Sequence, residues 1–189
     1  MNNYLPKEIE FNNLVIDWNK KINLVSRKKT DVYDLIDDSR IFIDHIDFSV
    51  KPRIMDLGTG GGFPGIVIKI HHPEIHVTLV DSIMKKITAV CDITSKLGLK
   101  DIPAVCIRAE DLAKNNVFKH TYDYVVARSV GNLKDLVKWS HEMIKPGGKL
   151  ITLKGGDIDG EIKQAKETKW VKSIEKKSGE GKEIITVNF

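Results

Sequence analysis

The stretch Asp56-Leu57-Gly58-Thr59-Gly60-Gly61-Gly62-Phe63-Pro64-Gly65 decides the fold of this 189-residue chain. It continues the short apolar run Arg53–Leu57, which is typical of a buried β-strand. Glycines at the carboxyl end of a strand let the backbone come close to a ligand, and open α/β sheets bind their ligands at this edge. The stretch therefore predicts a ligand-binding loop between a first strand and a helix that begins near Gly65.

Strand-like and helix-like stretches alternate along the chain after this loop. Further apolar runs lie at residues 76–81, 104–107, 122–127 and 149–153, and amphipathic helical stretches lie between them at 65–70, 83–97 and 133–144. The alternation predicts βαβ units, and hence an α/β fold with a doubly wound, mostly parallel sheet. A helix at 158–168 and strands near 170–174 and 183–187 are expected to follow.

Two helices are expected before the first strand. Apolar residues recur at helical spacing over residues 11–22 and again over 32–46, and Pro6 stands near a plausible helix start. The chain is therefore expected to comprise an N-terminal helical cap, residues 1–50, and a core at residues 51–189, within one compact domain.

The composition is that of an ordinary globular protein, with 41% hydrophobic and 30% charged residues. The net charge of +4 is compatible with an anionic partner and equally with a merely soluble surface. No apolar stretch approaches the roughly 20 residues of a membrane span. The N-terminus also lacks the charge and apolar core of a signal peptide. A cytoplasmic protein without a membrane partner is expected.

Cysteine and histidine show no metal-ligand pattern. Cys91 and Cys106 each lie in an apolar run and are expected to be buried free thiols. His71, His72 and His76 stand around a proline in a helix-to-strand connection, without a framework of carboxylates or cysteines. No metal site is therefore expected.

The glycine loop departs from the dinucleotide-binding pattern Gly-x-Gly-x-x-Gly. Gly58 and Gly60 fit this pattern, but Phe63 occupies the third glycine position. The acidic Asp56 would repel a pyrophosphate and would suit a ligand that carries an amino group or a sulfonium. An NAD-dependent oxidoreductase is therefore disfavoured. The residues of this loop expected to bind the cofactor are Asp56, Gly58, Gly60, Gly62 and Phe63.

Two later positions point to a nucleoside. Asp81 ends the second apolar run, 21 residues after Gly60, where a carboxylate can accept hydrogen bonds from both ribose hydroxyls. Ala109 and Glu110 follow the third run, beside the expected place of an adenine ring. A helix N-cap at Asp81 and an ordinary loop at Ala109-Glu110 are the structural alternatives. With the later turn at residues 144–150, this order of motifs is typical of class I S-adenosylmethionine-dependent methyltransferases.

Several longer motifs narrow the family. They are Gly62-Phe63-Pro64-Gly65, Asp81-Ser82 with Lys85-Lys86, Arg108-Ala109-Glu110, Ala127-Arg128-Ser129-Val130, Leu153-Lys154-Gly155-Gly156 and Trp18-Asn19-Lys20-Lys21-Ile22-Asn23-Leu24. From about Phe11 to Gly156 the chain resembles the ribosomal RNA small subunit methyltransferase G family, also known as the glucose-inhibited division protein B family. It departs from the family at Leu35, where a histidine is usual, and at Arg40, where a leucine is usual.

The resemblance implies S-adenosylmethionine as the cofactor and 16S rRNA of the small ribosomal subunit as the partner. It also implies methylation at N7 of the guanine conventionally numbered 527. This nitrogen has a lone pair and no proton at neutral pH, so catalysis by proximity and orientation suffices and no catalytic residue is assigned.

Basic residues near the predicted ligand edge are candidates for the acceptor side. Arg128 and Lys154 follow the fourth and fifth apolar runs and are expected to position the acceptor, with Arg128 also reaching the cofactor. Arg27, Lys28, Arg128 and Lys154 are expected to bind RNA phosphates. The structural alternatives are an ion pair of Arg128 with Asp123 or another acid, a solvated Lys154 and a solvated loop at residues 27–29.

Two other functions share the predicted cofactor site. One is a class I methyltransferase that acts on a small molecule or a protein, which would have no affinity for RNA. The other is a non-catalytic module that binds S-adenosylmethionine without transferring its methyl group. Measurements of RNA binding and of methyl transfer separate these functions from the predicted enzyme.

Overall fold

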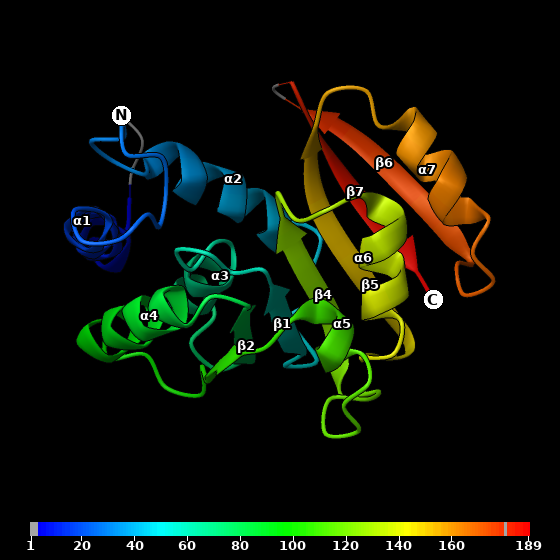
Figure 1. The fold of residues 1–189 in the computed structure, drawn as a ribbon, viewed down its shortest axis with the longest axis horizontal. Helices are drawn as coiled ribbons and strands as arrows, with labels where there is room; N and C mark the ends of the chain where they lie inside the picture. Colours follow the sequence, from blue (N-terminus) through cyan, green and yellow to red (C-terminus); the bar gives the residue numbers. More distant parts are fainter. Residues whose placement is uncertain (1–3, 180) are drawn as a thin grey trace.

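The computed structural model describes residues 4–179 and 181–189, and these residues form a sheet of seven strands (Figure 1). The strands are β1 (Arg53–Leu57), β2 (His76–Asp81), β3 (Ala104–Cys106), β4 (Tyr122–Arg128), β5 (Ile144–Gly155), β6 (Ser173–Gly179) and β7 (Lys182–Asn188). Their order is β3-β2-β1-β4-β5-β7-β6. Strands β1 to β5 are parallel, whereas β7 runs antiparallel to both β5 and β6. The predicted α/β fold with a mostly parallel sheet is confirmed.

Helices cover both faces of this sheet (Figure 1). Four helices contribute residues to the core on one face, namely α1 (Pro6–Asn19), α2 (Tyr33–Ile43), α3 (Gly65–His71) and α4 (Met84–Lys96). Three helices contribute residues to the core on the other face, namely α5 (Ala109–Leu112), α6 (Leu133–Ser140) and α7 (Asp159–Lys166). Successive side chains of a strand point to opposite faces. Accordingly Ile54 and Val126 pack in the first core, and Met55 and Val125 in the second.

The strand order reverses at β1, which pairs with β2 on one side and with β4 on the other. At such a point successive crossovers leave to opposite sides and open a crevice outside the carboxyl ends of the strands. The glycine loop follows β1 at this edge, Asp81 ends β2 there, and Arg128 ends β4 there. The topology therefore gathers motifs that lie far apart in the sequence.

The first two helices share the core of the sheet. Phe11 of α1 and Ile36 and Phe42 of α2 are fully buried in the same cluster as Ile54 of β1. The buried carboxylate of Glu8 in α1 also links this helix to α2 and α3 within the same layer. The helices preceding β1 thus pack directly on the sheet layer.

Glu8 is fully buried and pairs with Arg40 of α2 and His71 of α3. Its Oε1 lies 2.9 Å from Arg40 Nε and 2.9 Å from His71 Nε2. Burial acts to raise the pKa of Glu8, but the hydrogen bonds from Arg40 and His71 outweigh it and hold the pKa below its ordinary value. Arg40, a departure from the family pattern, therefore neutralises a buried charge.

Some boundaries differ from those expected. The helix predicted at 133–144 ends at Ser140, and the predicted turn at 144–150 lies inside β5. There the pairing with β4 shifts register between Tyr122 and Tyr124, so the turn residues form an irregularity within the strand. Strand β6 begins at Ser173 rather than near residue 170. Its side chains are nearly all exposed because it is an edge strand, so it shows no apolar alternation.

The expectation of buried thiols was wrong. Cys91 is exposed and Cys106 is partly exposed, and both are free. Cys91 lies on the outer side of α4, because Ile87, Val90 and Ile93 occupy the buried side of this helix. A cysteine within an apolar run is therefore not necessarily on the apolar face.

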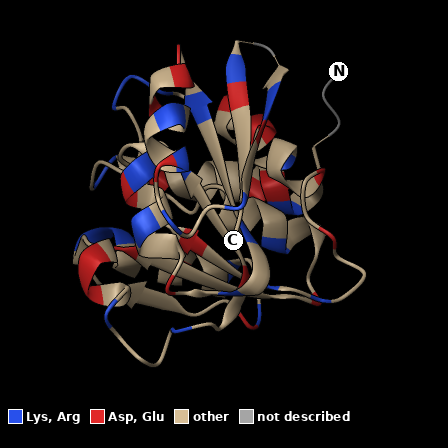
Figure 2. Ribbon diagram, turned by 90° about the vertical axis from the view of Figure 1, so that its right-hand side faces the viewer, with Lys and Arg blue, Asp and Glu red and all other residues tan. Residues whose placement is uncertain are grey.

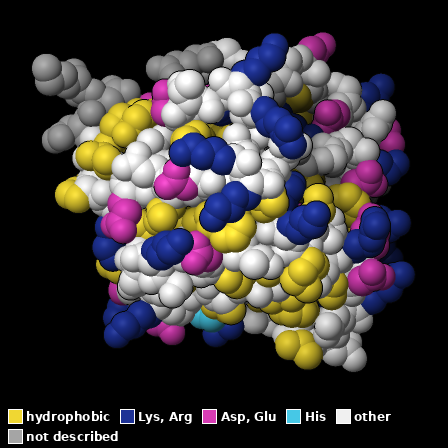
Figure 3. All heavy atoms as spheres, turned by 60° about the vertical axis from the view of Figure 1, so that its left-hand side comes forward, with side chains coloured by type: hydrophobic (Ala, Val, Ile, Leu, Met, Phe, Trp, Pro, Cys, Tyr) yellow, Lys and Arg dark blue, Asp and Glu magenta, His cyan; other side chains and the backbone are white. Residues whose placement is uncertain are grey.

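Charged residues of both signs are spread over the surface. Figure 2, which shows the side with β6 and β7, places Lys and Arg among Asp and Glu on both helices and strands. On the side that carries α1 and α4, acidic side chains likewise lie between basic ones (Figure 3). Within the described part of the chain, no helix has the length and apolarity needed to cross a membrane.

Candidate active site

A cavity of about 410 Å³ opens where β1, β2, β3 and β4 end. Its volume lies within the range of small-ligand sites. Four of the residues predicted to bind the cofactor line it, namely Gly58, Asp81, Ala109 and Glu110. Sequence reasoning missed other lining residues, among them Ile83, Gly131 and Trp139, and it named Arg108 and Val130 only as parts of family motifs. We call this space the cofactor cavity.

Asp81 joins two walls of the cofactor cavity. Its Oδ2 accepts a hydrogen bond from the backbone N–H of Gly60 at 3.0 Å, and its Oδ1 accepts one from the backbone N–H of Ile83 at 3.0 Å. The ammonium of Lys86 lies 3.7 Å from Oδ2. The bond to Ile83 shapes the turn into α4, but Asp81 is not the helix N-cap of the structural alternative, because Ile83 occupies that position. A carboxylate at this position on a cavity wall also suits the hydroxyls of a ribose.

Asp56 lies behind the glycine loop rather than on the cavity wall. It is fully buried, and its Oδ2 accepts hydrogen bonds from Thr59 Oγ1 at 2.6 Å and from the backbone N–H of Gly65 at 2.9 Å. Its Oδ1 is buried without a hydrogen-bond partner among the described residues. Burial raises the pKa of Asp56 to about 6, against the opposing effect of these hydrogen bonds. Asp56 therefore fastens both ends of the loop.

Three glycines of the loop have positive φ, namely 74° at Gly58, 56° at Gly60 and 100° at Gly62. A Cβ at Gly58 would lie 2.4 Å from the side chain of Val130, and one at Gly62 would lie 2.4 Å from Ile66. At Gly60 the nearest atom to such a Cβ is 3.9 Å away. Gly58 and Gly62 are thus required by packing, whereas Gly60 leaves open space beside the backbone.

The residues present fit S-adenosylmethionine. The open space beside Gly60 lies next to Asp81, whose carboxylate suits the ribose of a nucleoside. Ala109, at the start of α5, is small enough to leave room for an adenine ring on the same wall. The cavity therefore combines a polar position for the sugar with space for the base beside a small side chain.

Arg128 is largely removed from solvent. Its side chain is 19% exposed, and its guanidinium lies 5.6 Å from the ring centre of Phe63. Its Nη1 is 3.9 Å from Oδ2 of Asp38 in α2, so the alternative of an ion pair is realised with an acid other than Asp123. Burial lowers the pKa of Arg128, and the carboxylates of Asp38 and Asp56 oppose this effect. Arg128 does not line the cofactor cavity.

Asp38 is a residue that sequence reasoning missed. Its Oδ1 also accepts a hydrogen bond from Lys182 of β7, so it links α2 to both β4 and β7. Its partners lie 90 and 144 positions further along the chain, a separation at which no local pattern operates. The only available signal was its place between Leu35 and Arg40, the two positions at which the chain departs from the family pattern.

Lys154 is engaged within the protein. Its side chain is 10% exposed, and its ammonium lies 2.9 Å from Glu161 Oε2 and 2.5 Å from the carbonyl oxygen of Gly131. It therefore holds the loop between β4 and α6, which forms one wall of the cofactor cavity. It is not the solvated lysine of the alternative interpretation. Its contact with RNA stays a prediction.

Arg27 and Lys28 are exposed in the loop between α1 and α2. Leu24 of the same loop lies 3.6 Å from the Cβ position of Gly61, so this loop touches the glycine loop. Arg27 Nε donates a hydrogen bond to Asn23 Oδ1 at 2.5 Å. The loop that carries these two exposed basic side chains therefore contacts the glycine loop through Leu24, and their binding of RNA stays a prediction.

The histidines have ordinary structural surroundings. His71 pairs with Glu8, His72 stacks on Phe48 with ring centres 3.4 Å apart, and His76 lies 3.2 Å from Thr78 Oγ1. Across residues 4–179 and 181–189, no group of three or more His, Cys, Asp or Glu side chains is arranged to hold a metal ion.

A family model described as rRNA small subunit methyltransferase G matches residues 5–184. A Ribosomal RNA small subunit methyltransferase G from Desulforamulus reducens is 40% identical over 159 residues, which cover 82% of this chain and 66% of that protein. A protein of the same name from Clostridium botulinum (strain Loch Maree / Type A3) is 37% identical over 191 residues, which cover 96% and 74%. The chain thus spans about two thirds to three quarters of these relatives.

Solved structures share the fold at low sequence identity. The ribosomal protein L11 methylase from Lactobacillus delbrueckii subsp. bulgaricus matches with a TM-score of 0.65 and 19% identity, covering 82% of this chain and 77% of that one. The M. jannaschii protein TYW2 in complex with AdoMet matches with a TM-score of 0.65 and 13% identity, covering 86% and 77%. These likenesses support the fold, whereas the family model and the relatives also identify the family. The chain belongs to the rRNA small subunit methyltransferase G family.

Proposed function

We propose that this protein transfers the methyl group of S-adenosylmethionine to N7 of one guanine, conventionally numbered 527, in 16S rRNA of the small ribosomal subunit. The observation that carries this proposal is the meeting of Asp81, Ala109 and Glu110 with the glycine loop in one cavity, in a chain of this family. The names of the relatives support rRNA as the acceptor. We place the activity in the cytoplasm, where ribosomal subunits are assembled.

The methyl transfer requires little chemical participation from the side chains. Bound S-adenosylmethionine supplies a methyl group on a positively charged sulfur. The N7 lone pair forms the new C–N bond while the C–S bond breaks, and the electron pair of that bond stays on sulfur. The guanine takes up the positive charge and no proton is lost. The protein therefore has to align the reactants and exclude water, rather than supply a base.

The side chains of the cofactor cavity position one of the two reactants, S-adenosylmethionine. Asp81 holds the ribose, Ala109 and Glu110 border the adenine, and the open space at Gly60 admits the ligand to the backbone. Asp56 acts through other groups, because it fastens the glycine loop, and Lys154 holds the loop after β4 in addition to its proposed contact with RNA. Together these contacts fix the nucleoside before the acceptor arrives.

Basic residues position the other reactant, the RNA acceptor. Arg128 ends β4 beside Phe63 and close to the glycine loop, and we assign it to the acceptor side. Arg27 and Lys28 bind RNA phosphates, with Lys154 as a further contact. In this arrangement residues 1–50 form a cap on the core at 51–189, and the loop of the cap presents its cations to the RNA.

The test is transfer of labelled methyl groups to small ribosomal subunits prepared from a strain that lacks the modification. Label is expected in 16S rRNA as 7-methylguanosine at a single site. Label in protein or in a small metabolite would overturn the proposed acceptor. Binding of S-adenosylmethionine without transfer to any of these would instead indicate a non-catalytic module.

A further inference from the structure

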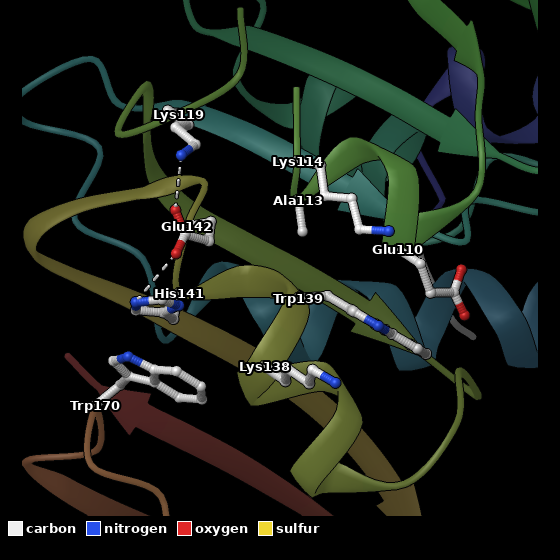
Figure 4. A pocket seen from close by; sticks show the side chains of 9 residues that line it. All are labelled: Glu110, Ala113, Lys114, Lys119, Lys138, Trp139, His141, Glu142 and Trp170. Atoms are coloured by element: carbon white, nitrogen blue, oxygen red, sulfur yellow. Dashed lines mark ion pairs between the residues drawn. The ribbon is translucent and has the colours of Figure 1, made fainter. Parts of the chain in front are cut away.

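A second cavity, of about 550 Å³, lies beside the cofactor cavity on the side of α5 and α6 (Figure 4). Glu110 and Trp139 line both cavities. Lys114, Lys138 and Trp170 are among the other residues that line the second one. We call it the aromatic–basic cavity. Neither the family motifs nor the proposed methyl transfer accounts for it.

The aromatic groups of this cavity are held in place. The ring of Trp170 stacks on His141 with centres 4.2 Å apart and planes inclined by 25°. Trp139 packs beneath the loop after β4, with its ring 3.6 Å from the Cβ position of Gly131. Figure 4 shows the two indoles bordering different parts of the cavity, and both are only partly buried. Partly exposed, fixed aromatic rings are the surfaces on which nucleic acids stack their bases.

Lysines surround these rings. Lys114 follows α5 and Lys138 belongs to α6, and Figure 4 shows their chains on opposite sides of Trp139. Both are exposed, and the ammonium of Lys169 lies 5.7 Å from the ring centre of Trp170. Cations on both sides of an aromatic ring suit a base with phosphates before and after it.

Two carboxylates face the cavity and limit its positive charge. Glu142 is engaged already, because it lies 3.4 Å from Lys119 and 3.7 Å from His141. Glu110 is shared with the cofactor cavity. Three lysines, Lys114, Lys119 and Lys138, line the cavity against these two carboxylates, and Lys169 stands over Trp170, so the cavity favours an anion. Burial lowers the pKa of His141, which keeps the ring beneath Trp170 uncharged near neutral pH.

We propose that the aromatic–basic cavity binds one nucleotide of a single-stranded RNA segment. The base stacks on Trp170, and Lys114 and Lys138 contact the flanking phosphates. That the RNA belongs to the methylation substrate rests on the proposed function, whereas the binding itself does not. A free nucleotide offers the same chemistry. A strand is favoured because Lys114 and Lys138 flank Trp139, whereas the stacking ring, Trp170, borders another part of the cavity, so the occupant has to extend beyond a single base.

The probe is a fluorescein-labelled oligoadenylate of ten residues, and its binding is followed by fluorescence anisotropy. Saturating S-adenosylhomocysteine keeps adenine out of the cofactor cavity. Trp170→Leu is expected to weaken binding by about tenfold, since base–aromatic stacking is worth ~1–3 kcal/mol. Trp170→Phe keeps an aromatic ring on His141 and should bind within about threefold of the unaltered protein, as expected for stacking that tolerates different rings. Equal binding by both variants would overturn the proposal.

The phosphate contacts are tested by the salt dependence. The double variant Lys114→Ala and Lys138→Ala should reduce the slope of log K against log salt by about 1.4, or ~0.7 for each lost contact. Lys96→Ala with Lys100→Ala removes the same charge from α4 and the segment after it, and should leave the slope unchanged. Equal slopes for the two double variants would refute the assigned contacts.

Two further measurements separate the remaining outcomes. Calorimetry should give the same affinity for S-adenosylhomocysteine with every variant. If a variant loses affinity for S-adenosylhomocysteine along with affinity for the oligonucleotide, the effect arises in the cofactor cavity and the proposal is overturned. Adenosine monophosphate should compete only weakly with the oligonucleotide, and equally tight binding would overturn the strand in favour of a free nucleotide as the occupant. Methylation of small subunits is measured independently, so RNA binding without transfer would contradict only the proposed function.

Discussion

Replacing Asp56 by Asn removes a fully buried negative charge from behind the glycine loop. The side-chain oxygen that accepts hydrogen bonds from Thr59 and from the backbone of Gly65 is retained. The new amide NH₂ takes the place of Oδ1, which has no hydrogen-bond partner in the described part of the chain. The substitution therefore changes the charge at this position with little change in shape or in the two existing bonds.

The expected effect on stability follows from the pKa of Asp56. Burial raises this pKa to about 6, from 3.8 in the absence of such effects. Between these two values the folded protein keeps a proton that the unfolded chain loses, so the free energy of unfolding falls as the pH rises and levels off above pH 6. At 1.36 kcal/mol for each pKa unit, the loss amounts to about 3 kcal/mol.

The Asn variant has no such titration. Relative to the unaltered protein, its free energy of unfolding should increase between pH 4 and pH 7 by about 2.4 kcal/mol, because part of the full change already lies below pH 4, and then stay constant. The buried amide without a partner adds a penalty of about 1–3 kcal/mol that does not depend on pH. The pH dependence of the difference is therefore the diagnostic quantity, rather than its value at a single pH.

Urea denaturation of both proteins at several pH values from 4 to 8 measures this difference. Asp17→Asn serves as the control, because the Asp17 side chain is 67% exposed and a hydrogen bond from Lys20 lowers its pKa. Its difference should therefore stay nearly constant between pH 4 and pH 8, because a lowered pKa places the titration of Asp17 below this range. If the difference for Asp56→Asn is the same at pH 4 and pH 8, or decreases as the pH rises, burial is not what governs this carboxylate.

Five other substitutions test the site and its support. Asp81→Ala should weaken binding of S-adenosylhomocysteine by about 1.5–3 kcal/mol in calorimetry, the cost of losing a charged hydrogen-bond partner, and unchanged affinity would contradict its role. Gly62→Ala should destabilise the protein more than Gly60→Ala, because its Cβ would lie 2.4 Å rather than 3.9 Å from the nearest atom, and equal melting temperatures would contradict this. Glu8→Ala should lower the free energy of unfolding by about 3–5 kcal/mol, as for a broken buried ion pair, and urea denaturation measures it. Arg128→Ala should impair methylation of small subunits while cofactor affinity stays nearly unchanged, and full activity would refute the assigned role.

The predictions from sequence were most accurate where local pattern and structure coincide. The run at residues 53–57 is β1, and the run at 76–81 is β2, because a buried parallel strand must be apolar along its whole length. The cofactor motifs follow the same logic. Since carboxyl ends of parallel strands meet at one edge, Gly58, Asp81 and Ala109 had to come together once the strands were identified. The family was also predictable from these motifs, and the family model confirms it.

Edge and turn positions were less predictable. Strand β6 owes its existence to backbone pairing with β7, and its exposed side chains show no alternation that a sequence pattern could reveal. Residues 145–148 have the composition of a turn and lie within β5, because the register shift against β4 absorbs them. Backbone hydrogen bonds between strands are largely independent of side-chain identity, so composition alone does not place them.

Only the tertiary structure decided how the charged residues are used. Arg128 and Lys154 were candidates for contacts with RNA, and the structure pairs them with Asp38 and Glu161. The aromatic–basic cavity likewise joins residues from α5, α6 and the segment before β6. Ion pairs and stacked rings depend on distances of a few ångströms between segments far apart in the chain. Sequence periodicity determines which side of a helix or strand is buried, but packing determines which side chains from different elements meet.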